Sequence, residues 1–408
     1  MKDVGKIRSS FPALKRKALN GKPAIYFDGP GASQMPNRVY RAYTDHVLND
    51  KANAGGYFET SVNTTEAVER ARIALALFMN CEAEEIVLGA NATTSVFQFS
   101  RAISRDWTSD DEVVVTKLDH FANVSPWVQV AKDKHCKVTS VNFDTNTGEF
   151  NVADFEKAIT KNTKLVALNY ACNAIGTINP VKEIIKIAHA KGAMVFVDAV
   201  HYAPHRLIDV QDIDCDFLVT SVYKYFGPHI SAVFAKKTHL ENFEPYKVEP
   251  ASDDVPNRWE TGTPDFSAIA AIPSTIKYII SLSEKSSPTR KNLELAYKNI
   301  TEYENELSRY FLNKVWELKH VKVHGIKNTD DVDKRTPTFG LTVEGKTSHQ
   351  VAEYLAKHGI FAWSGHFYAL DVVRSYDLEK EGLLRIGMLH YNTKREIKEL
   401  ISVLKLLS

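Results

Sequence analysis

The sequence predicts an α/β protein built on a parallel β-sheet. Two short apolar segments, 194–197 and 217–219, end in polar residues, Asp198 after the first and Thr220 and Ser221 after the second. Such segments are typical of strands buried on both faces of a parallel sheet, and ligands of open α/β sheets bind beyond the carboxyl ends of these strands. The length of 408 residues is long for one core, so we expect two domains and allow for dimerisation.

The composition narrows the class of protein. With 44% hydrophobic residues, 25% charged residues and a formal net charge of +1, neither nucleic acid nor an anionic membrane is expected as a partner. We find no signal peptide, and no segment approaches the length of a membrane helix. The cysteines form neither a CxxC motif nor a cluster with His, so we expect no metal site, no disulfide framework and a cytoplasmic location; they are Cys81, Cys136, Cys172 and Cys215.

An amine follows the second apolar segment. Lys224 comes three residues after Ser221, which places it and the Asp198 carboxyl group at the same edge of the sheet. A buried Asp keeps a pyridine nitrogen protonated, so that the ring is an electron sink, and a Lys forms a Schiff base with an aldehyde. The pair therefore predicts a pyridoxal phosphate site. Each residue alone has a simpler explanation, in which Asp198 caps a turn and Lys224 is solvated.

The segments 198–201 (DAVH) and 221–228 (SVYKYFGP) resemble the D-G-A-Q and S-G-H-K-x-x-G-P motifs of the class V aminotransferases, most closely the cysteine desulfurase branch. The resemblance extends along nearly the whole chain. It implies fold type I of the pyridoxal-phosphate-dependent transferases, with a mainly parallel seven-stranded sheet in a large domain and a smaller α+β C-terminal domain. We expect an N-terminal arm (1–20) that joins the small domain, a large domain (21–265) and a small domain (266–408).

The first expected elements are two loops and a helix. The segment 26–36 is too rich in Gly and Pro for regular structure, and it resembles the family's Y-L-D-x-A-A-x-x-x-x-P segment. The resemblance implies that Gly31 brings backbone close to the substrate, although an ordinary turn would use glycine equally well. After the loop 53–57 we expect a helix that Asn63 or Thr64 caps.

A phosphate site is expected after the strand 85–89. The turn 91–95 opens a helix, and the free N–H groups and dipole of a helix N-terminus attract an anion. This turn resembles the family's G-T-T-E segment, which implies that Thr93 and Thr94 bind the cofactor phosphate. The alternative is that either residue only caps the helix.

Two further strands lead to expected site residues. The strand 112–116 leads to D-H-F-A-N at 119–123, which resembles the family's E-H-H-A-N segment and implies that His120 stacks on the cofactor ring. The strand 164–170 leads to C-N-A-I-G-T, which resembles S-N-x-x-G-T. This second resemblance implies that Asn173 bonds the ring oxygen and the substrate carboxylate.

The resemblance implies further contacts with the cofactor. Val200 packs beneath the ring, His201 replaces the usual Gln beside the ring oxygen, and Ser221 binds the phosphate. Tyr223 stands where the desulfurases have a phosphate-binding His. Thr263, within R-W-E-T-G-T-P, corresponds to a Thr that reaches the phosphate of the neighbouring subunit, which implies a homodimer; the simpler reading is a Gly-Thr-Pro turn.

From residue 266 onward the pattern suits a smaller α+β domain. A long helix is expected after Pro288, followed by a strand at 339–343, a helix at 348–357 and a C-terminal helix from Lys394. Arg385 lies in a segment that resembles R-x-S-x-x-x-Y-N-T, which implies a bidentate grip on the substrate α-carboxylate. Taken alone, this Arg would more often form a salt bridge.

One segment departs from the family pattern. Residues 359–369 (GIFAWSGHFYA) align with G-I-x-x-R-x-G-H-H-C-A of the desulfurases, so that Tyr368 replaces the nucleophilic Cys and Trp363 replaces the Arg. A phenol of pKa about 10 cannot carry a persulfide. The resemblance keeps His366 and Tyr368 as substrate-binding candidates, and the aromatic character of the segment suits a bulkier side chain such as an S-conjugate.

These features predict a pyridoxal-phosphate-dependent lyase acting at Cβ of a small L-amino acid, by C–S lyase, desulfinase or β-decarboxylase chemistry. Lys224, His120 and Asp198 are its expected catalytic residues. Amino transfer is the enzymatic alternative. A cofactor-binding scaffold without turnover is the other alternative, and the presence of both Lys224 and Arg385 argues against it.

Overall fold

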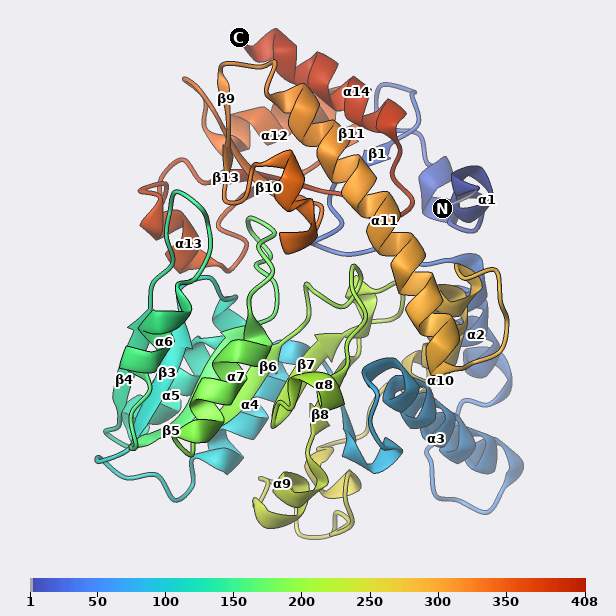
Figure 1. Cartoon of the computed structure of the whole chain (residues 1–408). Helices are drawn as coiled ribbons and strands as arrows, with labels where there is room; N and C mark the ends of the chain where they lie inside the picture. The colour runs from blue at the N-terminus through green and yellow to red at the C-terminus, as the bar shows by residue number, and fades with distance from the viewer. Residues whose placement is uncertain (1–2) are drawn as a thin grey trace.

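A seven-stranded sheet forms the centre of the computed structural model, which describes residues 3–408 (Figure 1). The strand order is β2-β8-β7-β6-β5-β3-β4, and neighbours are parallel except that β8 runs antiparallel to β2 and β7. The strands are β2 (Ile86–Gly89), β3 (Glu112–Thr116), β4 (Lys137–Val141), β5 (Thr163–Asn169), β6 (Met194–Asp198), β7 (Phe217–Ser221) and β8 (Ser231–Ala235). The predicted α/β class and mainly parallel sheet are confirmed.

Both faces of this sheet are buried along its central strands, because the apolar side chains of these strands point alternately to one face and to the other. In β6, Phe196 packs into the core on one face, whereas Val195 and Val197 pack into the core on the other. Helices α4 and α5 supply side chains to the Phe196 face, and α6, α7 and α8 supply them to the opposite face. These helices are α4 (Ala92–Ile103), α5 (Ser125–Asp133), α6 (Val152–Ala158), α7 (Val181–Ala190) and α8 (Val210–Ile213). The short helix α9 (Lys237–Asn242) follows β8.

A smaller antiparallel sheet, of order β12-β13-β10-β9, lies in the C-terminal part of the chain. Its elements, with the helices around it, are β9 (Val321–His324), β10 (Thr338–Val343), α12 (Ser348–Lys357), β12 (Trp363–Gly365), α13 (Leu370–Ser375), β13 (Leu383–Gly387) and α14 (Lys394–Leu404). The N-terminal strand β1 (Ile25–Tyr26) pairs in parallel with β11 (Ile360–Phe361), and Ile25 and Phe27 belong to the core of this smaller part. The N-terminal segment thus packs with the C-terminal one.

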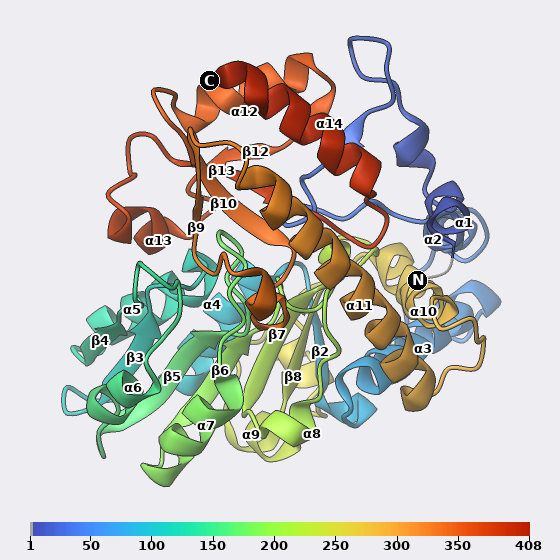
Figure 2. The ribbon, with the colours of Figure 1, turned by 45° about the horizontal axis from the view of Figure 1, so that its top comes forward.

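Long helices connect the two sheets. The N-terminal α1 (Val4–Ser9) precedes α2 (Asn37–Asn49) and α3 (Glu59–Met79), and α10 (Phe266–Ser281) packs against both α2 and α3. Helix α11 (Arg290–Val315) runs from this group of helices to the smaller sheet (Figures 1 and 2). Its first half joins the core of the large sheet through Leu293 and Ile300, and its second half joins the smaller core through Leu307 and Phe311. The domain limits given above stay predictions.

The start of α3 corrects one sequence-based expectation. The helix begins at Glu59, so Asn63 and Thr64 lie inside it and cap nothing. The Thr64 hydroxyl instead donates to the backbone oxygens of Asp50 and Thr60, at 2.8 and 2.9 Å. None of the helices within residues 3–408 is both long enough and apolar enough to cross a membrane.

Candidate active site

A cavity of about 640 Å³ lies at the carboxyl ends of β5, β6 and β7 and is bounded on its other side by residues of the smaller sheet. The structure brings twelve of the fifteen predicted site residues into its lining: Gly31, Thr93, His120, Asn173, Asp198, Val200, His201, Ser221, Tyr223, Lys224, Tyr368 and Arg385. Thr94, Thr263 and His366 are solvent-exposed and lie outside that lining. The cavity therefore collects residues from eight separate segments of the sequence.

Lys224 supplies the only amine in the cavity lining described here. It ends the short 3₁₀ turn Val222–Lys224 directly after β7. Its Nζ donates to the backbone oxygens of Pro30 and Gly31, at 2.5 and 2.6 Å, so the Gly-rich N-terminal loop holds it in place. Burial, and then the charge of Arg385, lower the pKa of Lys224 to about 7. An amine with this pKa is a neutral nucleophile in about half of the molecules at pH 7, whereas an ordinary Lys is almost entirely protonated.

Asp198 ends β6 beside Lys224, and it is almost fully buried. Its Oδ1 accepts a hydrogen bond of 2.8 Å from the Val200 backbone N–H. Burial raises the pKa of Asp198, and the same cause, followed by the charge of Asp198, raises the pKa of the neighbouring Asp119. Asp119 also lines the cavity and is a site residue that the sequence analysis missed. Its oxygens accept from the His120 backbone N–H and the Asn123 amide, at 2.7 and 2.8 Å, so it orders the turn that carries His120.

His120 is held as a neutral ring with a defined tautomer. Its Nδ1 accepts a hydrogen bond of 3.0 Å from the Ala122 backbone N–H, which leaves the proton on Nε2. Burial, followed by the charges of Lys224 and Arg385, lowers the pKa of His120 to about 4. The ring of Tyr368 stacks on it at 5.4 Å between centroids and 29° between planes. The Ala122 N–H and the stacked Tyr368 ring therefore fix the orientation of the His120 ring.

The N-terminus of α4 points to the cavity, but its cap differs from the expected one. Asn91 caps the helix by accepting from the Thr94 backbone N–H at 2.9 Å. Thr93 lines the cavity and Thr94 does not. Across the cavity, Tyr223 stacks on His229 at 4.2 Å with a 7° angle between planes, which fixes the phenol ring. The sequence analysis identified Tyr223 at this position but did not predict that His229 stacks on it.

Arg385 comes from β13 of the smaller sheet and is almost fully buried. Its Nη1 donates to the Asn173 backbone oxygen at 3.1 Å, its Nε has no partner within residues 3–408, and its guanidinium lies 4.2 Å from the centre of the Phe367 ring. The Asn173 amide in turn donates to the Phe367 backbone oxygen at 2.9 Å. Burial lowers the pKa of Arg385 to about 9, so it is still cationic at pH 7. Unused donors of a buried cation suit a carboxylate ligand.

Gly31 is required by packing against the aromatic segment. A Cβ at this position would lie 2.7 Å from Trp363 Nε1 and 3.0 Å from the Asp28 backbone oxygen. Asp28 is a second residue that sequence reasoning missed: burial raises its pKa to about 6, and the charges of Arg385 and Lys224 oppose that rise. The sequence around Asp28 gives no indication of this role, because only the folded chain brings Arg385 and Lys224 near it.

The residues of the cavity fit pyridoxal phosphate. An amine suited to the aldehyde and a buried acid suited to the ring nitrogen share one cavity, and the Asn173 Oδ1 atom is buried without a partner in the described chain. No donor within residues 3–408 bonds the second oxygen of Asp198, and a protonated ring nitrogen is the kind of group that would supply one. The fold and the site together define a pyridoxal-phosphate-dependent enzyme of fold type I.

Comparison with known proteins places the chain within this class. The aminotransferase class-V family model matches residues 25–400, so the chain belongs to that family. A probable cysteine desulfurase of Halalkalibacterium halodurans is 31% identical over 97% of this chain and 95% of its own length. An aminotransferase-like protein of Gibberella zeae, FGM3, is 30% identical over 99% and 98%. The solved structure of a cysteine desulfurase from Thermococcus onnurineus superposes with a TM-score of 0.88 at 27% identity, covering 100% of this chain and 98% of that one.

The lowered pKa of Lys224 leads to a prediction for cofactor uptake. Because only the neutral amine attacks an aldehyde, we expect the rate at which the cofactor-free protein takes up pyridoxal phosphate to rise as the pH passes through about 7 and then to level off. The growth of the visible absorption band after rapid mixing measures this rate. A rate that keeps rising toward 10.5, the ordinary pKa of a Lys, would contradict the burial argument.

Proposed function

We propose that this protein is a pyridoxal-phosphate-dependent lyase that acts at Cβ of a small L-amino acid. One observation carries the proposal: Lys224 and Arg385 line the same cavity, and none of the four cysteines does. Cys172 comes nearest in sequence to a lining residue, but it is fully buried, and burial raises its pKa to about 11. The relatives named cysteine desulfurases support chemistry at Cβ, whereas the absence of a thiol from the lining argues against a persulfide relay.

The residues of the chain divide the work. Bound pyridoxal phosphate supplies an electron sink next to the Cα of the amino acid. Asp198 keeps a positive charge on the ring nitrogen, and His120 covers one face of the ring. Arg385 binds the α-carboxylate and so orients the Cα–H bond toward Lys224. The neutral Lys224 amine would then take the proton from Cα, and in C–S cleavage the thiolate would leave Cβ with the electron pair of the C–S bond.

An aromatic wall lines the outer side of the cavity and consists of Trp363, Phe367 and Tyr368. Phe367 and Tyr368 both have left-handed backbone, with φ of 53° and 57°, which is costly for residues with a Cβ. Hydrogen bonds hold them there, because Asn173 donates to the Phe367 backbone oxygen and the Phe121 N–H donates to that of Tyr368, at 2.9 and 2.7 Å. This aromatic wall supports a substrate with an apolar or aromatic group on the atom that leaves Cβ.

The products identify the reaction. The purified holoprotein is incubated with L-cysteine, cysteine sulfinate, aspartate and S-conjugates of cysteine, and the products are analysed. We expect pyruvate, ammonia and a thiol from the S-conjugates, in larger amount than from free cysteine; desulfinase or β-decarboxylase chemistry would instead give alanine, with sulfite from cysteine sulfinate or carbon dioxide from aspartate. A new oxo acid with no Cβ–S cleavage would assign the protein to amino transfer, and a holoprotein that turns over none of the panel would favour a binding scaffold.

The proposal includes a homodimer in which Thr263 completes the site of the neighbouring subunit. Thr263 is exposed and outside the cavity of its own chain, as this role requires. Sedimentation of the holoprotein tests the dimer, and a monomer that retains full activity would exclude it. The four free cysteines support a reducing compartment such as the cytoplasm.

A further inference from the structure

His201 lines the cavity and has a single hydrogen-bond partner within residues 3–408. Its side chain is buried, and its Nε2 lies 3.0 Å from Thr336 Oγ1. No protein group described here bonds Nδ1. Because Nε2 is engaged and the ring lines the cavity, Nδ1 is the nitrogen that a bound group can reach.

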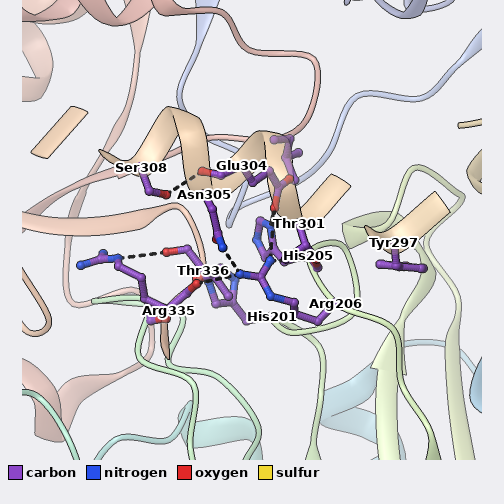
Figure 3. A network of polar contacts seen from close by, with 12 residues as sticks. His201, His205, Arg206, Tyr297, Thr301, Glu304, Asn305, Ser308, Arg335 and Thr336 are labelled. Carbon is purple, nitrogen blue, oxygen red and sulfur yellow. Dashed lines mark hydrogen bonds and ion pairs between the residues drawn. The ribbon is translucent and has the colours of Figure 1, made fainter. Parts of the chain in front are cut away.

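One face of α11 holds the loop that carries His201 (Figure 3). Tyr297 Oη donates to the Ala203 backbone oxygen at 2.6 Å, and Thr301 Oγ1 donates to that of His205 at 3.3 Å. Glu304 pairs with His205 Nδ1 at 2.8 Å, and both side chains are almost completely buried. These α11 residues recur at helical spacing, so they form one ridge against the loop.

Arg206 ties the same loop to the segment that contains Thr336 (Figure 3). Its Nη2 donates to Asn305 Oδ1 at 2.9 Å and to the Arg335 backbone oxygen at 3.2 Å. The Thr336 backbone N–H donates to the Gly176 oxygen at 2.8 Å. Both the loop and the Thr336 backbone are therefore anchored, and the freedom left to His201 is rotation of its own side chain.

The ring of His201 is surrounded by cationic and titratable groups. His205 of its own loop packs edge-on at 5.2 Å, with Glu304 of α11 behind it, and Arg385 of β13 and Lys224 after β7 lie on the cavity side. Burial, followed by the charges of His205, Arg385 and Lys224, lowers the pKa of His201. The Thr336 hydroxyl donates its single proton to the Gly176 backbone oxygen at 3.2 Å, so its Oγ1 accepts from His201 Nε2–H. A neutral imidazole has one donor and one acceptor nitrogen, so Nδ1 is then the acceptor.

We propose that Thr336 is a positioning residue of this site: its hydroxyl fixes the rotamer and tautomer of His201 and thereby sets the hydrogen bond that Nδ1 makes with the ring oxygen of the cofactor. This inference rests on the proposed function, because it takes the cavity to hold pyridoxal phosphate. Thr336 belongs to the C-terminal part of the chain, 135 residues from His201. The ionisation of the cofactor is therefore tied to a contact between the two parts of the molecule.

The test compares Thr336→Val, which keeps the shape of the side chain without its hydroxyl, with Thr336→Ser, which keeps the hydroxyl. The visible absorption of each holoprotein is recorded as a function of pH. We expect Thr336→Val to move the midpoint of the spectral titration by roughly half to one pH unit, the size of one hydrogen bond, and Thr336→Ser to titrate like the wild type.

Thr301→Val is the matched control. It removes a Thr hydroxyl bond to the same loop, of 3.3 Å, without touching His201. We expect it to loosen the loop and to leave the spectral midpoint unchanged. An unchanged midpoint in Thr336→Val, or an equal shift in Thr301→Val, overturns the inference. A wild-type protein that binds no pyridoxal phosphate overturns the proposed function instead.

Discussion

Replacing Lys224 by Ala is expected to abolish covalent attachment of pyridoxal phosphate and to lower turnover by roughly 10⁴-fold or more, because the side chain acts as both nucleophile and base. The cavity lining described here contains no second amine that could substitute. Arg385, its other strong cation, has a pKa of about 9 and stays charged, so it cannot take over as a base at neutral pH.

Borohydride reduction followed by peptide mapping measures the attachment directly. In the wild type the reduced cofactor should be recovered on the peptide that contains Lys224, and in Lys224→Ala on no peptide. Lys132→Ala is the matched control, since Lys132 is exposed on α5, far along that helix from the cavity. Its labelling and turnover should equal those of the wild type. Recovery of the label from the Lys224→Ala protein would refute the assignment of Lys224.

The central pair of residues was predictable because strand order alone brings it together. Asp198 ends β6, Lys224 follows β7, and these strands are parallel neighbours in which Asp198 faces Val219. The apolar character of both segments marks them as buried strands, and polar residues at their carboxyl ends then face one edge. No knowledge of distant contacts is needed for this step.

The sequence did not predict correctly which residues cap the helices α3 and α4. The first turns of α3, residues 60–65, are rich in Ser, Thr and Asn, all of which favour caps. In the structure α3 begins earlier without a side-chain cap, and the hydroxyls of Ser61 and Thr64 bond the backbone of the preceding loop. Likewise Asn91, and not Thr93 or Thr94, caps α4. Several adjacent residues could cap equally well, and tertiary contacts decide which one does.

Residues that act through long-range contacts could not be predicted. Thr336 meets His201 only because α11 and the C-terminal sheet fold back over the loop after β6, and nothing in the sequence around Thr336 marks a site. Asp28 and Asp119 gain their raised pKa values from burial, which is a property of the folded chain. Neither the composition of the chain nor the spacing of its residues reveals a long-range contact or the burial of a particular carboxyl group.

Replacing Arg385 by Gln is expected to lower kcat/KM for L-amino acids by about 30-fold to several thousand-fold, equivalent to roughly 2–5 kcal/mol, because the substrate carboxylate would enter the cavity without its charged partner. Arg385→Lys keeps the charge but loses the planar fork, so its loss should be smaller. Cofactor binding, followed by the visible spectrum, should persist in both variants. A kcat/KM that is unchanged in Arg385→Gln would remove Arg385 from the substrate site.

The two variants also separate carboxylate binding from the electrostatic effect of Arg385 on Lys224. After burial, the charge of Arg385 is the largest cause that lowers the pKa of Lys224, so Arg385→Gln should raise the pH midpoint of cofactor uptake above about 7, whereas Arg385→Lys should leave it nearly in place. If Arg385 only braced the Asn173 backbone, both variants would lose thermal stability alike and neither would move this midpoint. A shift confined to the uncharged variant therefore requires that Arg385 act on the amine through its charge, within the cavity that both residues line.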